Sequence, residues 1–114
     1  MTPFGEMTEE DFDDLIAHEE MTLDEYQDKA TQFAIYGGGL LYATIGLASE
    51  AGEVAGKVKR LLRDDDIDFT ADDVTEEIDY EQARAIASEC GDTLWYLASV
   101  ANEIGYSLEE IAEM

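Results

Sequence analysis

Basic residues are scarce in this chain of 114 residues: six Lys and Arg stand against 29 Asp and Glu, for a formal net charge of −23. Binding to nucleic-acid polymers and to anionic membrane surfaces depends on clustered Lys and Arg, so neither partner is expected. The acidity fits either adaptation to a salt-rich cytoplasm, where the Debye length is about 3 Å at 1 M salt, or an acidic interaction surface. Scarce Lys, abundant Asp and dispersed acids favour the first interpretation.

Cysteine, histidine and long apolar runs are also nearly absent. Cys90 is the single cysteine, which excludes an internal disulfide framework and fits a reducing, cytoplasmic location. Its place within an apolar helical stripe predicts a buried thiol. His18, the single histidine, lacks the Glu-x-x-His context of a di-iron bundle. No apolar run approaches the roughly 18 residues of a spanning helix, and no basic-then-apolar leader opens the chain.

The length fits one domain, residues 1–114, with 46% hydrophobic residues to form a compact core. Burial improves with chain size, so a short helical chain often completes its core by self-association. We therefore expect a homodimer or homotetramer.

Helical periodicity and capping signals account for most of the chain, and no strand is predicted. Helices are expected over about residues 8–20, within an N-terminal extension of residues 1–21, and over 22–36, 40–63, 80–104 and from 107 onward. The acidic insertion 64–79 is predicted to be a solvated loop, with at most a short helical turn. The predicted fold class is all-α, a compact helical bundle of four-helix type with two long antiparallel helices.

The two long helices each carry a carboxylate pair with the same spacing, Glu50/Glu53 and Glu89/Asp92. Residues three apart project from one side of a helix. At 100° per residue, both pairs lie at the same edge of their helix's apolar stripe. If the helices pack antiparallel around one core, both pairs border one crevice. Four hard oxygen donors there would suit Mg²⁺, with Mn²⁺ as a substitute.

Chance is the competing explanation, because a single E-x-x-E on a solvated helix face is common in so acidic a chain. Two equivalent pairs in small-residue surroundings favour a metal site. Gly52 and Gly91 lie beside the acids, and a glycine inside a helix costs about 1 kcal/mol against Ala. These two glycines therefore indicate either close backbone approach or room for a ligand.

Around these acids the chain resembles the MazG-like all-α nucleoside triphosphate pyrophosphohydrolases. The likeness rests on G-L-A-S-E-A-G-E-V from Gly46 and E-C-G-D-T-L-W-Y-L from Glu89, and it extends over about residues 23–114. The resemblance implies Mg²⁺-dependent hydrolysis of a (deoxy)nucleoside triphosphate to the monophosphate and pyrophosphate, in nucleotide-pool house-cleaning. It also implies metal ligation by Glu50, Glu53, Glu89 and Asp92, with Glu50 or Glu53 as general base.

Substrate-binding candidates lie near the acids on both helices. Lys57, one turn after Glu53, is the first candidate to balance charge on the pyrophosphate, and Lys59 or Arg60 is the second. Cations in the last turns of a helix are also ordinary compensation of its dipole. Trp95 and Tyr96 are candidates to stack on a nucleobase; the alternative for this aromatic pair is a place in the core or a dimer interface.

Three departures from the family pattern qualify the resemblance. Ser49 stands where the first of two paired glutamates is often found, the gap between Glu53 and Glu89 is long, and relatives often continue beyond the position of Met114 with an Asn and basic residues. Two alternatives therefore remain beside the main hypothesis. One is a related dUTP or phosphoribosyl-ATP pyrophosphohydrolase, and the other is a non-enzymatic acidic helical interaction module with a vestigial metal site.

Overall fold

The computed structural model describes residues 20–32, 34 and 37–114, and among these residues there are helices and no strands. The elements in chain order are α2 (Leu23–Thr31), α3 (Gly39–Asp64), the 3₁₀ turn η1 (Val74–Glu76), α4 (Tyr80–Ile104) and α5 (Leu108–Ala112). The prediction of an all-α fold is confirmed for this part of the chain. The helix expected over residues 8–20 falls almost wholly outside it.

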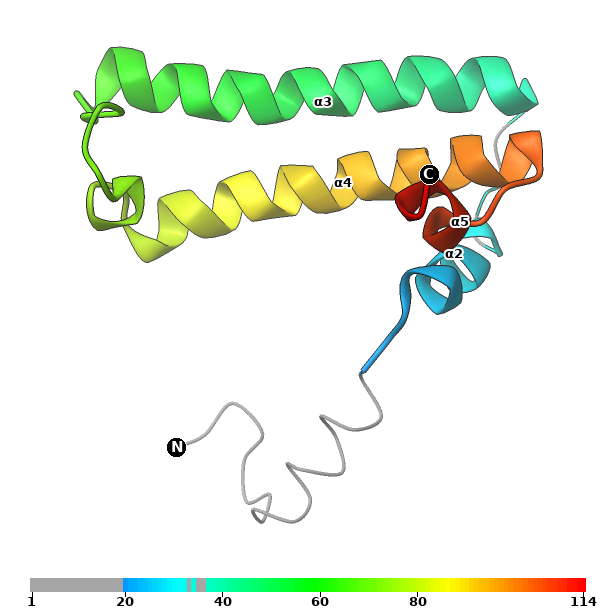
Figure 1. The fold of residues 1–114 in the computed structure, drawn as a ribbon. Helices are drawn as coiled ribbons and strands as arrows, with labels where there is room; N and C mark the ends of the chain where they lie inside the picture. The colour runs from blue at the N-terminus through cyan, green and yellow to red at the C-terminus, as the bar shows by residue number, and fades with distance from the viewer. Residues whose placement is uncertain (1–19, 33, 35–36) are drawn as a thin grey trace, which may run out of the picture.

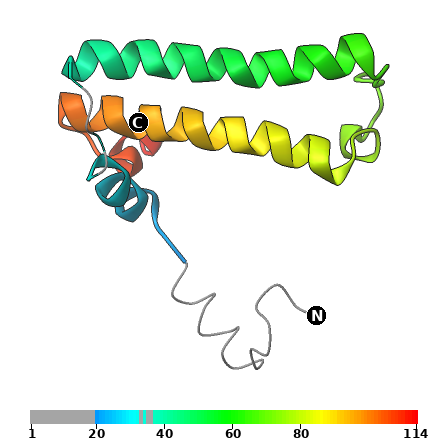
Figure 2. The same cartoon turned by 180° about the vertical axis from the view of Figure 1, so that it is seen from behind.

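The two long helices lie side by side and form the body of the molecule (Figure 1). The chain runs along α3, passes through the loop that contains η1, and returns along α4, as both views show (Figure 2). Helix α2 packs on α4 near the end of the hairpin that lies away from the loop, and α5 packs on α2. Within the described residues, no helix is long and apolar enough to cross a membrane.

Local capping chemistry sets the helix ends where the sequence predicts them. Thr22 accepts a hydrogen bond from the backbone N–H of Glu25 at the start of α2. Asp79 and Ser107 each form a capping box, at the starts of α4 and α5. Gly105 ends α4 in the left-handed conformation, with φ of 83°, which glycine adopts without a Cβ penalty.

Helix α2 is shorter than predicted: it ends at Thr31, whereas the sequence predicted a helix to about residue 36. The hydroxyl of Thr31 donates to the backbone carbonyls of Gln27 and Asp28. The same kind of bond also occurs inside α4, from Thr93 to the Glu89 carbonyl and from Ser99 to the Trp95 carbonyl, so it accompanies the end of α2 without causing it. The chain then turns toward α3.

The core of the described chain lies where α4, α2 and α5 meet. Ala98, Ala101 and Leu108 are buried there. Partly buried apolar side chains pack around these three: Tyr26, Leu94 and Ile111. Burial is concentrated at this end of the hairpin, which therefore holds α2 in a defined position against α4.

The buried amide of Gln27 connects α2 to the C-terminal turn and α5. Its Nε2 donates to the Tyr106 carbonyl oxygen (2.9 Å), and its Oε1 accepts from the Leu108 backbone N–H (2.8 Å). Asp24, one turn earlier, accepts from the backbone N–H of Glu109 (3.0 Å). Because a buried polar group without a partner costs about 1–3 kcal/mol, this amide fixes α2 specifically rather than by apolar contact alone.

The predicted apolar stripe of α4 is wrong in part. Cys90, predicted to be a buried thiol, is exposed, and Leu97 and Ile104 on the same stripe are 37% and 51% exposed. Two members of the predicted stripe do lie in the core, because Ala101 is buried and Leu94 packs against it. Helix α4 is packed on two sides, by α3 and by α2, and small side chains lie where the neighbouring helices approach. The stripe is therefore covered at Leu94 and Ala101 and exposed at Cys90, Leu97 and Ile104.

Candidate metal centre

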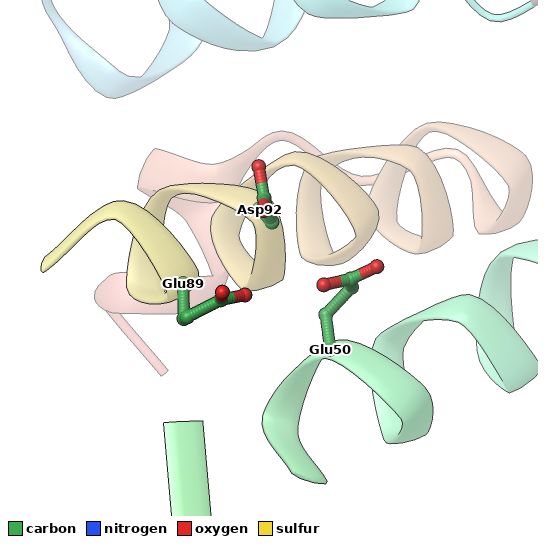
Figure 3. Close-up of side chains that lie close together, drawn as sticks. All are labelled: Glu50, Glu89 and Asp92. Atoms are coloured by element: carbon green, nitrogen blue, oxygen red, sulfur yellow. The ribbon is translucent and has the colours of Figure 1, made fainter. Parts of the chain in front are cut away.

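Three of the four predicted acids come together between the long helices. Glu50 from α3 and Glu89 and Asp92 from α4 each offer a carboxylate oxygen, and the three oxygens lie within 4.8 Å of one another. Figure 3 shows Glu50 and Glu89 pointing toward each other across the gap between their helices, with Asp92 rising from the next turn of α4. We call this set the acid group.

The register of the two helices places the acid group. A Cβ at Gly46 would overlap the ring of Tyr96, so a glycine at this position lets the two helices approach closely. Gly46 lies one turn before Glu50, and Tyr96 lies one turn after Asp92. The close contact therefore fixes the neighbouring turn, where Glu50 faces the α4 acids.

The electrostatics of the acid group favour a bound cation. The pKa of Glu50 is raised above its usual value, first by partial burial and then by the negative charges of Asp92, Glu89 and Glu53. Among the described residues, no ion pair joins the three acids of the group to a Lys or Arg. Closely held carboxylates without a counter-charge repel one another, and a hard divalent cation offsets that repulsion. The donor set therefore fits Mg²⁺ or Mn²⁺.

Glu53 is not brought into the acid group. It lies one turn beyond Glu50 on α3 and its side chain is exposed. Its charge nevertheless reaches the site, because it is one of the charges that raise the pKa of Glu50. The expectation of four converging carboxylates is thus met by three of them, and the fourth lies beside the group.

The basic residues of α3 lie toward its C-terminal end. Lys57 is half-buried and two turns beyond Glu50, about 10.5 Å along the helix axis. Lys59 and Arg60 are exposed, and the charge of Arg60 helps to lower the pKa of Asp64, after the hydrogen bond from Arg63. Of the three predicted cations, Lys57 is the one that combines partial burial with the helix face of Glu50.

The two predicted aromatic residues occupy different surroundings. Tyr96 packs against Gly46, and its ring centroid lies 6.4 Å from that of Tyr42, so its ring is part of the contact between the long helices. Trp95 meets Tyr96 edge-on, with centroids 5.0 Å apart and an angle of 82°. Trp95 also lines a cavity on the α2 side of α4. The contact between the long helices thus accounts for Tyr96, whereas Trp95 contacts Tyr96 and lies on the α2 side of α4.

That cavity brings in residues to which sequence analysis assigned no role, Tyr26 and Lys29 on α2. The charge of Asp92 raises the pKa of Tyr26, after the larger effect of burial, so α2 lies close to the acid group. The signal in the sequence is weak. Lys29 is the one basic residue that precedes Lys57, but periodicity does not show which helix α2 packs on.

Two explanations were given above for Gly52 and Gly91: close approach of another backbone, or room for a ligand. A Cβ at either position would meet no atom within 4 Å. Close backbone approach within the described chain is therefore excluded. Both glycines are exposed, so room for a ligand or a second chain stays a prediction.

Comparison with known proteins gives two matches. The family description "MazG nucleotide pyrophosphohydrolase domain" matches residues 41–114, which include the whole acid group. The "Gene 37 protein" of Mycobacterium phage L5 is 38% identical over 101 residues, covering 82% of this chain and 81% of the phage protein. No solved structure matches the chain. The chain belongs to the MazG nucleotide pyrophosphohydrolase family.

Proposed function

We propose that the protein is a Mg²⁺-dependent nucleoside triphosphate pyrophosphohydrolase that converts a (deoxy)nucleoside triphosphate and water to the monophosphate and pyrophosphate. The observation that carries this proposal is the convergence of Glu50, Glu89 and Asp92 from two helices to within 4.8 Å. An acidic cluster alone is common, but this one lies in the matched family domain and has no Lys or Arg paired to it within the described residues.

The metal ligands in this proposal are Glu50, Glu89 and Asp92, with Glu53 as the fourth carboxylate. Mg²⁺, for which Mn²⁺ can substitute, supplies charge neutralisation of the phosphates and activation of water when bound. Glu50, Glu89 and Asp92 would hold the metal between α3 and α4, where it would supply the positive charge that the substrate phosphates require.

The general base in this proposal is Glu50 or Glu53. One of these carboxylates accepts a proton from the attacking water as its oxygen bonds to the α-phosphorus. The bond from the α-phosphorus to the bridging oxygen breaks, and its electron pair leaves with pyrophosphate. Glu50 is within the acid group, whereas Glu53 is exposed and free of the α4 acids. Variants of these two residues therefore separate the roles of ligand and base.

We propose that a set of basic residues and a pair of aromatic residues make the remaining contacts with the substrate. Lys57 is the first candidate to bind the leaving pyrophosphate, because it lies on the face of Glu50, and Lys59 and Arg60 are the second. Trp95 and Tyr96 are proposed to contact the nucleoside. The packing of Tyr96 on Gly46 supports a positioning role for Tyr96, and the open side of Trp95 supports direct contact.

A homodimer or homotetramer is part of the proposal, because apolar residues line the uncovered side of α3. Leu41 and Ile45 are 70% and 61% exposed. They belong to an exposed stripe that continues at the alternating three- and four-residue spacing of a helix–helix seam: Leu41, Ile45, Ala48, Gly52, Ala55, Lys59 and Leu62. Pairing of this stripe with a second copy would build the four-helix bundle that one chain lacks.

Charge reversal on this stripe tests the assembly. Ile45→Glu should shift the sedimentation coefficient toward that of the single chain, whereas Leu23→Glu, at an exposed position of α2, should leave it unchanged. An unaltered assembly in Ile45→Glu would reject this face as the interface.

Hydrolysis itself is tested by incubating the purified protein with each NTP and dNTP plus Mg²⁺, at low and high salt, and assaying pyrophosphate. Release of pyrophosphate that disappears in Asp92→Asn and persists in Glu81→Gln, an exposed acid on the same helix, supports the proposal. The same panel identifies the base, and adding dUTP and phosphoribosyl-ATP covers the related activities. No turnover of any substrate would favour an interaction module with a vestigial site. Activity of this kind would place the protein among cytoplasmic nucleotide-pool enzymes.

A further inference from the structure

The side chain of Arg60 folds back along α3 toward the acid group. Its guanidinium lies over Gly56, where an added Cβ would be 3.6 Å from Nη1, 3.8 Å from Nη2 and 4.0 Å from Cζ of Arg60. Gly56 precedes Arg60 by about one helical turn. Helix side chains lean toward the N-terminal end of their helix, so the charge of Arg60 lies about one turn nearer to the acid group than its backbone does.

Gly56 provides the place for this guanidinium, because a longer side chain there would occupy the same space. Gly56 is half-buried and lies about 9 Å along the helix axis from Glu50 and about 4.5 Å from Glu53. Residues seven apart share a helix face, so Arg60 lies on the side of α3 that carries Glu53. A positive charge therefore follows the carboxylates on that side of the helix.

The donors of Arg60 are not used within the described chain. No hydrogen bond or ion pair joins Arg60 to another described residue. The neighbouring Asp64 is bound by Arg63, with distances of 2.6 Å from Nε to Oδ1 and 2.8 Å from Nη2 to Oδ2. That hydrogen bond is the main cause of the lowered pKa of Asp64, and the charge of Arg60 is the smallest contribution. The Arg60 guanidinium is therefore available to an anion.

Lys57, Lys59 and Arg60 differ in the direction in which they leave the helix. Lys57 is half-buried on the face of Glu50. Lys59 is rotated by about 100° from Arg60 and belongs to the exposed stripe described above. An arginine also differs from a lysine in its chemistry, because its planar fork of N–H donors binds phosphate oxygens in pairs. Arg60 thus combines the phosphate-binding group with a place one turn beyond Glu53.

We propose that Arg60 binds the terminal phosphate of the substrate and thereby selects a nucleoside triphosphate over a diphosphate. The proposal rests on the proposed function, since it requires the α-phosphate to lie at the acid group and the other phosphates to extend along α3 past Glu53. Lys57 then faces the inner phosphates, and the guanidinium over Gly56 faces the γ-phosphate. A diphosphate is too short to reach this guanidinium.

Binding of uncleavable analogues tests the assignment, because binding does not depend on turnover. The probes are the α,β-methylene analogues of each NTP and dNTP with Mg²⁺, and the matching diphosphate analogues, which lack only the γ-phosphate. Isothermal titration calorimetry measures both affinities. Arg60→Gln should weaken binding of the triphosphate analogues about 10-fold and leave binding of the diphosphate analogues unchanged. The loss should be smaller at high salt, because salt screens an exposed charge pair.

Further variants separate the guanidinium from its surroundings. Gly56→Leu should reproduce the loss, because the leucine side chain occupies the place of the guanidinium. Arg60→Lys should restore part of the affinity, since it keeps the charge but not the fork of donors. Arg84→Gln is the matched control, as Arg84 is an exposed arginine in the first turns of α4. An equal loss in Lys59→Gln would overturn the assignment to Arg60. Circular dichroism checks that each variant is folded.

The outcomes distinguish this assignment from the proposed function. Hydrolysis of nucleotides together with an unchanged preference for triphosphate analogues in Arg60→Gln would overturn the role of Arg60 and leave the activity standing. A preference for triphosphate analogues that is lost in Arg60→Gln, without turnover of any nucleotide, would support the role of Arg60 and reject the hydrolase. No binding of any analogue would overturn both.

Discussion

Helices α3 and α4 are alike in sequence but differ in what surrounds them. Each is about 25 residues long and carries a pair of acids three residues apart. Helix α4 packs between α3 and α2, and both acids of its pair, Glu89 and Asp92, belong to the acid group. Helix α3 has α4 as its main neighbour and contributes only Glu50. The same motif therefore yields two ligands on one helix and one on the other.

The difference shows that spacing determines which side chains share a helix face, whereas the neighbouring helices determine which way that face points. Glu53 shares a helix side with Glu50, yet it lies outside the cluster. Leu41 and Ile45 are exposed for the same reason, because nothing in the described chain covers that side of α3. Four measurements test this contrast, and they follow in order of decreasing expected effect.

The largest effect is expected for substitution of Asp92 on α4. Asp92→Asn should lower kcat/KM at least about 100-fold, because it removes a proposed metal ligand, whereas loss of a residue that only hydrogen-bonds to a ligand costs about 10–100-fold. Glu53→Gln should lower it less, since Glu53 is outside the acid group. Pyrophosphate release across a Mg²⁺ titration measures both. Equal losses would show that Glu53 enters the group when substrate binds and would weaken the contrast between the helices.

The second effect concerns the two hydrogen bonds of the buried Gln27 amide, which connect α2 to the C-terminal turn and α5. Gln27→Ala should lower the free energy of unfolding by about 1–3 kcal/mol, because the Leu108 N–H and Tyr106 carbonyl lose their partner. Urea unfolding followed by circular dichroism measures the change. Gln32→Ala is the control, as Gln32 is exposed at the end of α2. Similar values for both variants would contradict a specific role of the buried amide.

The third effect concerns the contact between the two long helices. Gly46→Ala should destabilise the fold by about 1–2 kcal/mol, because the added Cβ overlaps the Tyr96 ring and the cost of overpacking exceeds the gain in helix propensity. Gly91→Ala is the matched control on α4. It meets open space and should stabilise by up to about 1 kcal/mol. Thermal unfolding of both variants measures the difference, and a loss in Gly91→Ala would mean that a second chain fills that space.

The smallest effect concerns the pH dependence of stability without metal. The folded-state pKa of Glu50 is raised, so the protonated form favours folding, and this contribution is lost as pH rises through that pKa. Glu50→Gln should therefore raise Tm in EDTA at pH 7, and the gain should shrink toward pH 4. Added Mg²⁺ should raise Tm of the natural protein more than that of the variant. A gain that does not vary with pH would show that the charge of Glu50 is not its cause.

Much of the fold could be predicted because helix formation and termination are local. The caps at Thr22, Asp79 and Ser107 and the stop at Gly105 depend on side chains within a few residues, and the long helices begin and end within one residue of the predicted positions. Helix α2 was predicted too long, because its C-cap is Gln32 and not a glycine, so no stop signal in the sequence marks this end.

The site could be predicted only as a set of candidates. Residue type and spacing marked the four acids, but the exclusion of Glu53 depends on how α3 is rotated against α4. The exposure of Cys90 and the place of Tyr26 near Trp95 depend in the same way on how the helices pack. None of these relations is visible in the periodicity of one helix, because they join residues far apart in the chain.

By itself, the amino-acid sequence determined the helices, the ends of the two long ones, the extreme negative charge and the residue types able to bind a hard cation. Only the tertiary structure decided which three carboxylates meet, which aromatic ring packs between helices and which one borders a cavity. The physical reason is that hydrogen bonds and capping act over a few residues. Convergence of charges is instead set by the packing of helices, here by the close approach of Gly46 to Tyr96.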